Sequence, residues 1–155
     1  MGAQGLLIRN PKLTPEEFSK HWYNRHALVI VPFFLYCGVK NYVQIHAPVK
    51  TTQDDLDLAS YDGAAETELT PLLLAAITDP SSLPTWVVDY YKEVILADER
   101  EFLVSEAMKH IKQVEEGTVT GERKAIIEDG KVVIEVPEGV WETWRGYETK
   151  GGEVK

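Results

Sequence analysis

The sequence predicts an α+β domain with a largely antiparallel sheet and with helices packed on one face of it. Helical and strand-like segments mix without strict alternation, which is typical of this class. A capping box at Thr14 marks one helix start, and Asp129-Gly130 lies between two apolar segments, which predicts a β-hairpin. With 155 residues, of which 44% are hydrophobic and 26% charged, the chain is predicted to form one domain, residues 1–155.

The first elements are a short strand and a helix. Residues 5–9 (GLLIR) form an apolar segment that ends at an Asn-Pro pair, as expected of a strand closed by a turn. Thr14 can cap the helix that follows, because Pro15 suits the first helical position and Glu17 completes the capping box.

This helix carries two histidines five residues apart. At about 100° per residue, Phe18, Trp22 and His26 fall on one stripe that faces the sheet. His21 points about 140° away from His26 and is predicted to lie on the surface. The two histidines are therefore not expected to share a ligand, and a metal site is not predicted.

An apolar run and a polar-faced strand come next. Residues 27–34 (ALVIVPFF), which include a proline, are expected to form a wall or lid over a cavity. Residues 40–47 (KNYVQIHA) alternate in the manner of a strand, with Tyr42, Gln44 and His46 on one face.

A third strand is predicted at 60–69 (SYDGAAETEL). Its small residues Gly63, Ala64 and Ala65 leave room for a side chain close to the backbone. Glu66 follows them and is the one acidic residue at the centre of this segment.

The second half of the chain is predicted as two helices, a strand, a hairpin and a tail. In order, these are helices 71–77 and 82–103, a strand-like segment at 108–114, the hairpin 123–136, and a tail with Trp141, Trp144 and Tyr147 at three-residue steps. The core is predicted at about residues 5–127, with the hairpin and tail, 122–155, as an extension. Because helices would cover only one face of the sheet, the other face is expected to pair with a second copy of the chain.

The composition excludes several classes of function. The longest apolar run, 27–36, is well short of the roughly 20 residues that cross a bilayer. No signal peptide is recognised, so a cytoplasmic protein without a membrane span is predicted. The net charge of -9 disfavours nucleic-acid binding. No P-loop, GxGxxG, GxSxG or metal-ligand cluster occurs, so no cofactor or metal is predicted.

Four motifs occur in a fixed order over about residues 5–103: NPKLTPEEFSKHWYNRHA, NYVQIHA, SYDGAAETEL and ADEREFL. This series resembles the EthD-like proteins of the dimeric α+β barrel superfamily, especially the small members encoded in fungal polyketide pathways. Each motif alone is weak, and the combination is specific. The charged segment 109–124 and the tail lie outside the resemblance.

The resemblance implies a ferredoxin-like dimeric α+β barrel, and therefore a homodimer in which each protomer encloses a pocket between sheet and helices. It implies a cofactor-free lyase or cyclase that dehydrates, decarboxylates or cyclises a small-molecule aromatic polyketide. Two alternatives stay open: a cofactor-independent monooxygenase acting on anthrone-type or quinol-type substrates, and a small-molecule-binding barrel without enzymatic activity.

Such reactions move a proton on or off carbon beside a carbonyl group, which suits a histidine because both of its protonation states are accessible near neutral pH. The candidate catalytic residues are His26, His46, Tyr42 and Glu66. The candidate substrate-binding residues are Trp22, Phe33, Phe34, Gln44, Trp86, Tyr90 and His110.

Structural interpretations compete with these roles. His26 can be a capping histidine near a helix end, Tyr42 can be a core tyrosine, and alternation can place Glu66 in solvent. Trp86 and Tyr90 have the helical spacing of a pair that only packs.

Overall fold

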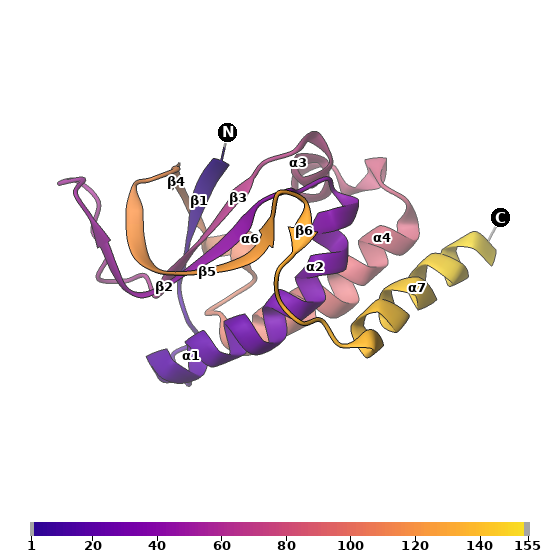
Figure 1. Cartoon of the computed structure of the whole chain (residues 1–155), viewed down its shortest axis with the longest axis horizontal. Coiled ribbons are helices and arrows are strands. Elements are labelled where there is room, and N and C mark those ends of the chain that lie inside the picture. The colour runs from indigo at the N-terminus through magenta and orange to yellow at the C-terminus, as the bar shows by residue number, and fades with distance from the viewer. Residues whose placement is uncertain (1, 154–155) are drawn as a thin grey trace.

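The chain folds into a βαββαβ core with two additional strands and a C-terminal helix (Figure 1). The computed structural model describes residues 2–153. The strands are β1 (Gly2–Leu7), β2 (Tyr42–Thr51), β3 (Gly63–Glu68), β4 (Lys112–Glu115), β5 (Val119–Glu128) and β6 (Lys131–Val132). They form one antiparallel sheet in the order β4-β1-β3-β2-β5-β6. This is the predicted α+β class, and the βαββαβ order of its core is that of ferredoxin-like folds.

Two long helical rods connect the core strands. The first contains α1 (Pro15–His21), η1 (Trp22–His26) and α2 (Ala27–Tyr36) and leads from β1 to β2. After β3 come α3 (Pro71–Thr78), the short η2 (Pro80–Ser82), and the second rod of α4 (Thr85–Tyr90), η3 (Tyr91–Leu96) and α5 (Ala97–Phe102). The short α6 (Ala107–His110) precedes β4, and α7 (Glu138–Glu153) follows β6. Both η1 and η3 are π-helical turns.

The predicted capping box starts the first rod. The Thr14 side chain accepts a hydrogen bond from the Glu17 backbone N–H at 3.1 Å, and the Glu17 carboxylate accepts one from the Thr14 N–H at 2.8 Å. The stripe of Phe18, Trp22 and His26 is buried against the sheet, as predicted. Gly63 makes this contact possible, because a Cβ there would lie 2.6 Å from the Trp22 ring.

The helices cover one face of the sheet. Tyr42 of β2 packs with residues of the helical rods in the largest core cluster. A second cluster contains Leu6, Ile45 and Val119 together with residues of the loop between β2 and β3, and the other members named in it also come from strands and this loop. Strand alternation separates the two clusters, because neighbouring residues of a strand point to opposite faces.

Several predicted boundaries differ from the structure. The first strand occupies residues 2–7 rather than 5–9, and the second continues to Thr51. The segment 108–114 is wrong as a single strand, because α6 takes its first part and β4 begins at Lys112. The predicted hairpin turn is confirmed, since Asp129 and Gly130 have φ values of 50° and 79°. The second arm of the hairpin is shorter than predicted, because β6 ends at Val132.

The tail is a helix, α7, which was not predicted. Its Trp144 ring lies 5.0 Å from Trp86 and 4.8 Å from Tyr90, and its Tyr147 ring lies 5.5 Å from Tyr90. Two of its internal positions are Gly146 and Gly151, so its intrinsic helix propensity is poor. Packing of its aromatic residues on α4 therefore accounts for this helix better than propensity does.

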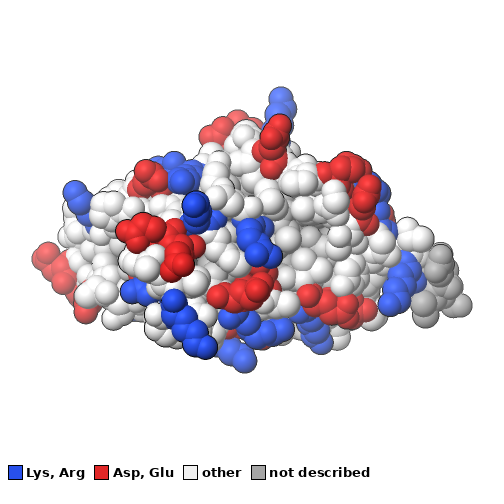
Figure 2. All heavy atoms as spheres, turned by 90° about the horizontal axis from the view of Figure 1, so that it is seen from below, with Lys and Arg blue, Asp and Glu red and all other residues white. Residues whose placement is uncertain are grey.

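None of the described helices is both long enough and apolar enough to cross a membrane. Figure 2 shows acidic and basic side chains interspersed on the face seen from below. Although the whole chain has a net charge of -9, the acidic side chains on that face do not form one continuous patch.

Candidate active site

A cavity of about 110 Å³ lies between the helical layer and the sheet. Its lining is mostly apolar and aromatic, with contributions from β1, β2, β3, both rods and the segment around α6. The lining includes Trp22, His26, Tyr42, Leu69, Tyr91, Glu99, Phe102 and Met108. Ligand pockets commonly measure roughly 300–1,000 Å³. A multi-ring ligand would therefore have to displace wall side chains, of which Leu69 and Met108 are 43% and 41% exposed.

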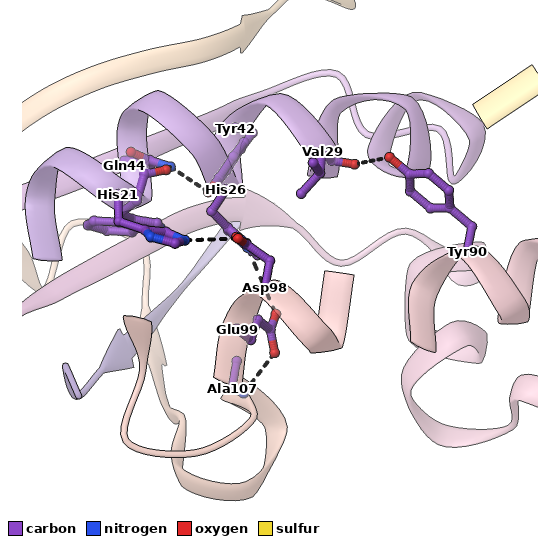
Figure 3. A network of polar contacts seen from close by, with 10 residues as sticks. His21, His26, Val29, Tyr42, Gln44, Tyr90, Asp98, Glu99 and Ala107 are labelled. Atoms are coloured by element: carbon purple, nitrogen blue, oxygen red, sulfur yellow. Dashed lines mark hydrogen bonds and ion pairs between the residues drawn. The ribbon is translucent and has the colours of Figure 1, made fainter. Parts of the chain in front are cut away.

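His26 is fixed on the cavity wall by Asp98 (Figure 3). The distance between His26 Nδ1 and Asp98 Oδ2 is 3.0 Å, and both residues are buried. Burial opposes ionisation of Asp98, but hydrogen bonds from His21 and His26 outweigh it and hold the pKa of Asp98 well below its usual range. Because an ionised carboxylate can only accept, Nδ1 of His26 carries the proton in this contact. In the neutral imidazole, Nε2 is then free to accept a proton.

The second histidine of the helix binds the same carboxylate. His21 Nε2 lies 2.8 Å from Asp98 Oδ1, and the His21 ring stacks on Phe102. The prediction that His21 points away from His26 and lies on the surface is wrong. A π-helical turn spaces its hydrogen bonds five residues apart, so residues five apart come to nearly the same side. The turn η1, Trp22–His26, produces this alignment.

Glu99 is the second ionisable group at the cavity. Its Oε2 lies 3.9 Å from His26 Nε2, and its Oε1 accepts a hydrogen bond from the Ala107 N–H at 2.9 Å. Burial raises the pKa of Glu99, although His26 and the Ala107 N–H oppose that rise. Glu99, beside His26, therefore keeps its proton up to a higher pH than an exposed glutamate does.

Tyr42 faces the cavity from the sheet, and a row of polar side chains stands behind it. Gln44 Nε2 donates to Tyr42 Oη at 3.1 Å and to the Trp22 carbonyl at 2.9 Å. Gln44 Oε1 lies 2.9 Å from His46 Nε2, and His46 Nδ1 lies 2.8 Å from the hydroxyl of Ser19. Burial raises the pKa of Tyr42 well above its ordinary value, so the phenol keeps its proton.

Comparison with known protein families matches residues 10–106 to the EthD domain. The chain belongs to the EthD domain family. No curated protein and no solved structure matches it. The matched residues include His26, Tyr42, Asp98 and Glu99. Part of the cavity wall, including Met108, lies beyond the EthD domain.

Seven of the predicted site residues lie at the cavity or directly behind its wall. Five line the cavity: Trp22, His26, Phe33, Phe34 and Tyr42. Gln44 and His46 do not line it, but lie buried behind Tyr42 in the hydrogen-bonded row.

Glu66 lies on the opposite face of the sheet from the cavity. Its neighbours in β3, Ala65 and Thr67, line the cavity, so alternation points Glu66 away from it. Its carboxylate pairs with Arg123 and accepts a hydrogen bond from Gln4, and these contacts lower its pKa. The structure therefore does not place Glu66, a candidate catalytic residue, where it can reach a ligand in the cavity.

Three further predicted residues have structural contacts instead. Trp86 packs between Tyr36 and the C-terminal helix. Tyr90 donates its hydroxyl proton to the Val29 carbonyl at 2.6 Å, as Figure 3 shows. His110 accepts a hydrogen bond from the Ile8 N–H at 3.1 Å. None of the three is among the residues that line the cavity in the described part of the chain.

The sequence interpretation missed Asp98 and Glu99. Their only sequence signal is the ADEREFL motif, which contributes to the family resemblance but does not by itself indicate that either residue belongs to a site. Among the residues that the structure describes, one group of three could hold a metal ion: ligand atoms of His21, Asp98 and Glu101 lie within 4.8 Å of one another. In the structure, His21 and Asp98 are hydrogen-bonded to each other instead.

His46 gives the EthD domain a pH-dependent stability. Burial lowers its pKa to about 4, and Lys124 contributes to the shift. The unfolded chain therefore binds this proton more readily than the native one. The stabilising contribution is complete above about pH 6.5 and is lost as the pH falls from 6.5 towards 4.

We expect the free energy of unfolding to be roughly 2 kcal/mol lower at pH 5 than at pH 7.5 because of His46. Urea unfolding at the two pH values measures it. His46→Gln should remove most of this difference, and an equal difference in the variant would contradict the assignment to His46.

Proposed function

We propose that this EthD domain protein is a cofactor-free enzyme, a lyase or cyclase, that moves protons at carbon beside a carbonyl group of an aromatic polyketide-like substrate. The observation that carries the proposal is the position of His26, whose Nδ1 contacts Asp98 while its Nε2 lies beside Glu99 on the wall of an apolar cavity. An oriented imidazole on the wall of a cavity that can hold a substrate is the arrangement that general acid–base catalysis requires.

In this proposal, His26 is the base. Its Nε2 removes the proton from the carbon next to the carbonyl group, and Asp98 stabilises the imidazolium that forms. Asp98 also keeps the ring in the tautomer that leaves Nε2 unprotonated. His21 holds the other oxygen of Asp98, so that carboxylate is fixed from two sides.

Glu99 is the acid. A carboxyl group whose pKa is raised by burial can deliver a proton to a leaving hydroxyl or to a carbanion. After the reaction, the protonated His26 and the ionised Glu99 would lie 3.9 Å apart, measured between Nε2 and Oε2. A proton passed from the imidazolium to the carboxylate, directly or through one water molecule, restores both groups.

The aromatic walls support the choice of substrate. Trp22, Phe33, Phe34, Tyr91 and Phe102 offer flat apolar surfaces, and Tyr42 offers a hydroxyl to an oxygen of the ring system. Aromatic side chains around a few fixed polar groups are typical of sites that bind planar organic molecules.

The proposal is tested by incubating the full chain with an anthrone, an anthraquinone and β-keto acid polyketides and measuring product masses. Loss of water indicates dehydration, loss of carbon dioxide indicates decarboxylation, and gain of oxygen indicates the monooxygenase alternative. Oxygen consumption, measured in parallel, distinguishes the monooxygenase reaction from dehydration and decarboxylation.

On the substrate that turns over, Glu99→Gln should lower kcat by roughly 10²-fold or more, because glutamine cannot deliver the proton. The matched control is Glu101→Gln, an exposed residue of the same helix, for which kcat should stay within about twofold. Equal rates for Glu99→Gln and the wild type would remove Glu99 from the mechanism.

A further inference from the structure

The row of polar residues behind Tyr42 has a defined direction of donors and acceptors. Its contacts are Ser19 to His46, His46 to Gln44, Gln44 to Tyr42, and Gln44 to the Trp22 carbonyl. The row begins at Ser19 on α1 and ends at Tyr42, which lines the cavity.

The Trp22 carbonyl determines which groups of the row donate hydrogen bonds and which accept them. A backbone carbonyl can only accept a hydrogen bond, and it lies 2.9 Å from one end of the Gln44 side chain. That end must be the NH₂ group, since a flipped amide would place two oxygens against each other. The amide oxygen of Gln44 therefore faces His46.

The orientation of the Gln44 amide determines where the other protons of the row lie. His46 Nε2 faces the Gln44 oxygen at 2.9 Å and must carry a proton to bond with it. In the neutral ring, Nδ1 then has no proton and accepts from the hydroxyl of Ser19 at 2.8 Å. At the other end of the row, the second N–H of Gln44 donates to Tyr42 Oη.

Tyr42 therefore accepts from Gln44 and must send its own proton elsewhere. Tyr42 is 2% exposed and lines the cavity. Among the described residues, no hydrogen bond is found in which Tyr42 is the donor, whereas the buried Tyr90 hydroxyl donates to a carbonyl. The unused donor of Tyr42 is available to a molecule in the cavity.

We infer that Gln44, oriented by the Trp22 carbonyl and by His46, is a positioning residue that makes Tyr42 an obligate hydrogen-bond donor, so that the cavity selects ligands with an acceptor oxygen at that point. In the proposed reaction, on which this last identification rests, that oxygen is the substrate carbonyl, which gains negative charge as His26 removes a proton. A phenolic donor placed there stabilises the enolate more than the ketone.

The first experiment needs no ligand. Nitrogen NMR of the histidine rings at pH 7 reports which nitrogen of His46 is protonated. The expected result is a proton on Nε2, and a proton on Nδ1 would overturn the inference. In Gln44→Met, which removes the amide, the Nε2 proton should lose its acceptor and exchange faster with water.

The second experiment compares two single-ring probes, acetophenone and α-methylstyrene, which have nearly the same shape but differ in the acceptor oxygen. A single aromatic ring is chosen because it needs less room than a multi-ring ligand in a cavity of about 110 Å³. The measured quantity is the ratio of the two dissociation constants. A substitution that changes the hydrophobicity of the cavity affects both probes alike, so this effect cancels in the ratio.

Tyr42→Phe should shift this ratio against acetophenone by about three- to tenfold, the effect of losing one hydrogen bond. Gln44→Met should shift it in the same direction by a smaller factor. The matched control is Tyr90→Phe, a buried tyrosine whose hydroxyl donates to the Val29 carbonyl and which is not among the described residues that line the cavity; it should leave the ratio unchanged.

A ratio that is the same in Tyr42→Phe and in wild type overturns the inference, as does a shift of equal size in Tyr90→Phe. Neither readout depends on turnover. The inference can therefore fail while His26 is still required for activity, and it can hold in a protein whose reaction differs from the one proposed.

Discussion

Replacing His26 by glutamine is expected to lower kcat/KM by roughly 10²- to 10⁴-fold, the usual contribution of a positioned acid or base. Glutamine can still place an amide N–H near Asp98, so the fold should persist, but it offers no group that takes up a proton at the position of Nε2. The measurement is the rate of product formation on the substrate that the mass comparison identifies, together with a urea unfolding curve that verifies the fold.

The matched control is His110→Gln. His110 is a partly buried histidine of α6, and it accepts a backbone hydrogen bond rather than lining the cavity. Its variant should keep kcat/KM within about twofold of wild type. If the two variants lose activity equally, or if His26→Gln keeps full activity in a folded protein, His26 is not the base.

The fold could be predicted from the sequence because its signals are local. Thr14 and Glu17 cap a helix through contacts three residues apart, and the alternation of Tyr42, Gln44 and His46 predicts the face that these residues share. Asp129 and Gly130 have the backbone angles that their turn requires. Each of these patterns depends on a few neighbouring residues, and the structure confirms each of them.

The centre of the candidate site could not be predicted, because it depends on a helix that departs from its regular period. A count of 100° per residue separates His21 from His26, whereas the π-helical turn between them brings both to one carboxylate. No pattern of residues in this segment predicts a π-helical turn. The second rod contains a π-helical turn as well, just before Asp98.

The position of Glu66 and the helix α7 could not be predicted for a different reason. The strand at 63–68 consists mainly of small and polar residues, so it lacks the apolar alternation that would have shown which face Glu66 occupies. In α7, the decisive interactions are made with Trp86 and Tyr90, which are remote in sequence. Both outcomes depend on tertiary contacts that a local pattern does not contain.

Asp98→Asn is expected to destabilise the protein by about 3 kcal/mol at pH 7, the upper part of the range for losing a hydrogen bond to a charged group. Asp98 is 8% exposed and accepts hydrogen bonds from two histidines. An asparagine can accept only one of these bonds with its single oxygen, and it presents N–H groups to the other ring. Urea unfolding of both proteins measures the difference, with Asp89→Asn on α4 as a control that should change stability by less than about 0.5 kcal/mol.

The pH dependence of this difference identifies its cause. Hydrogen bonds from the two histidines hold the pKa of Asp98 below its ordinary value despite burial. The stability that the ionised carboxylate contributes is therefore complete above the pKa of the unfolded state, about 4, and is lost as the pH falls further. Wild type and Asp98→Asn should thus differ fully at pH 7 and progressively less below pH 4. A difference that stays constant through this range would mean that Asp98 stabilises the fold by packing rather than by its charge, and the orientation of His26 would then need another explanation.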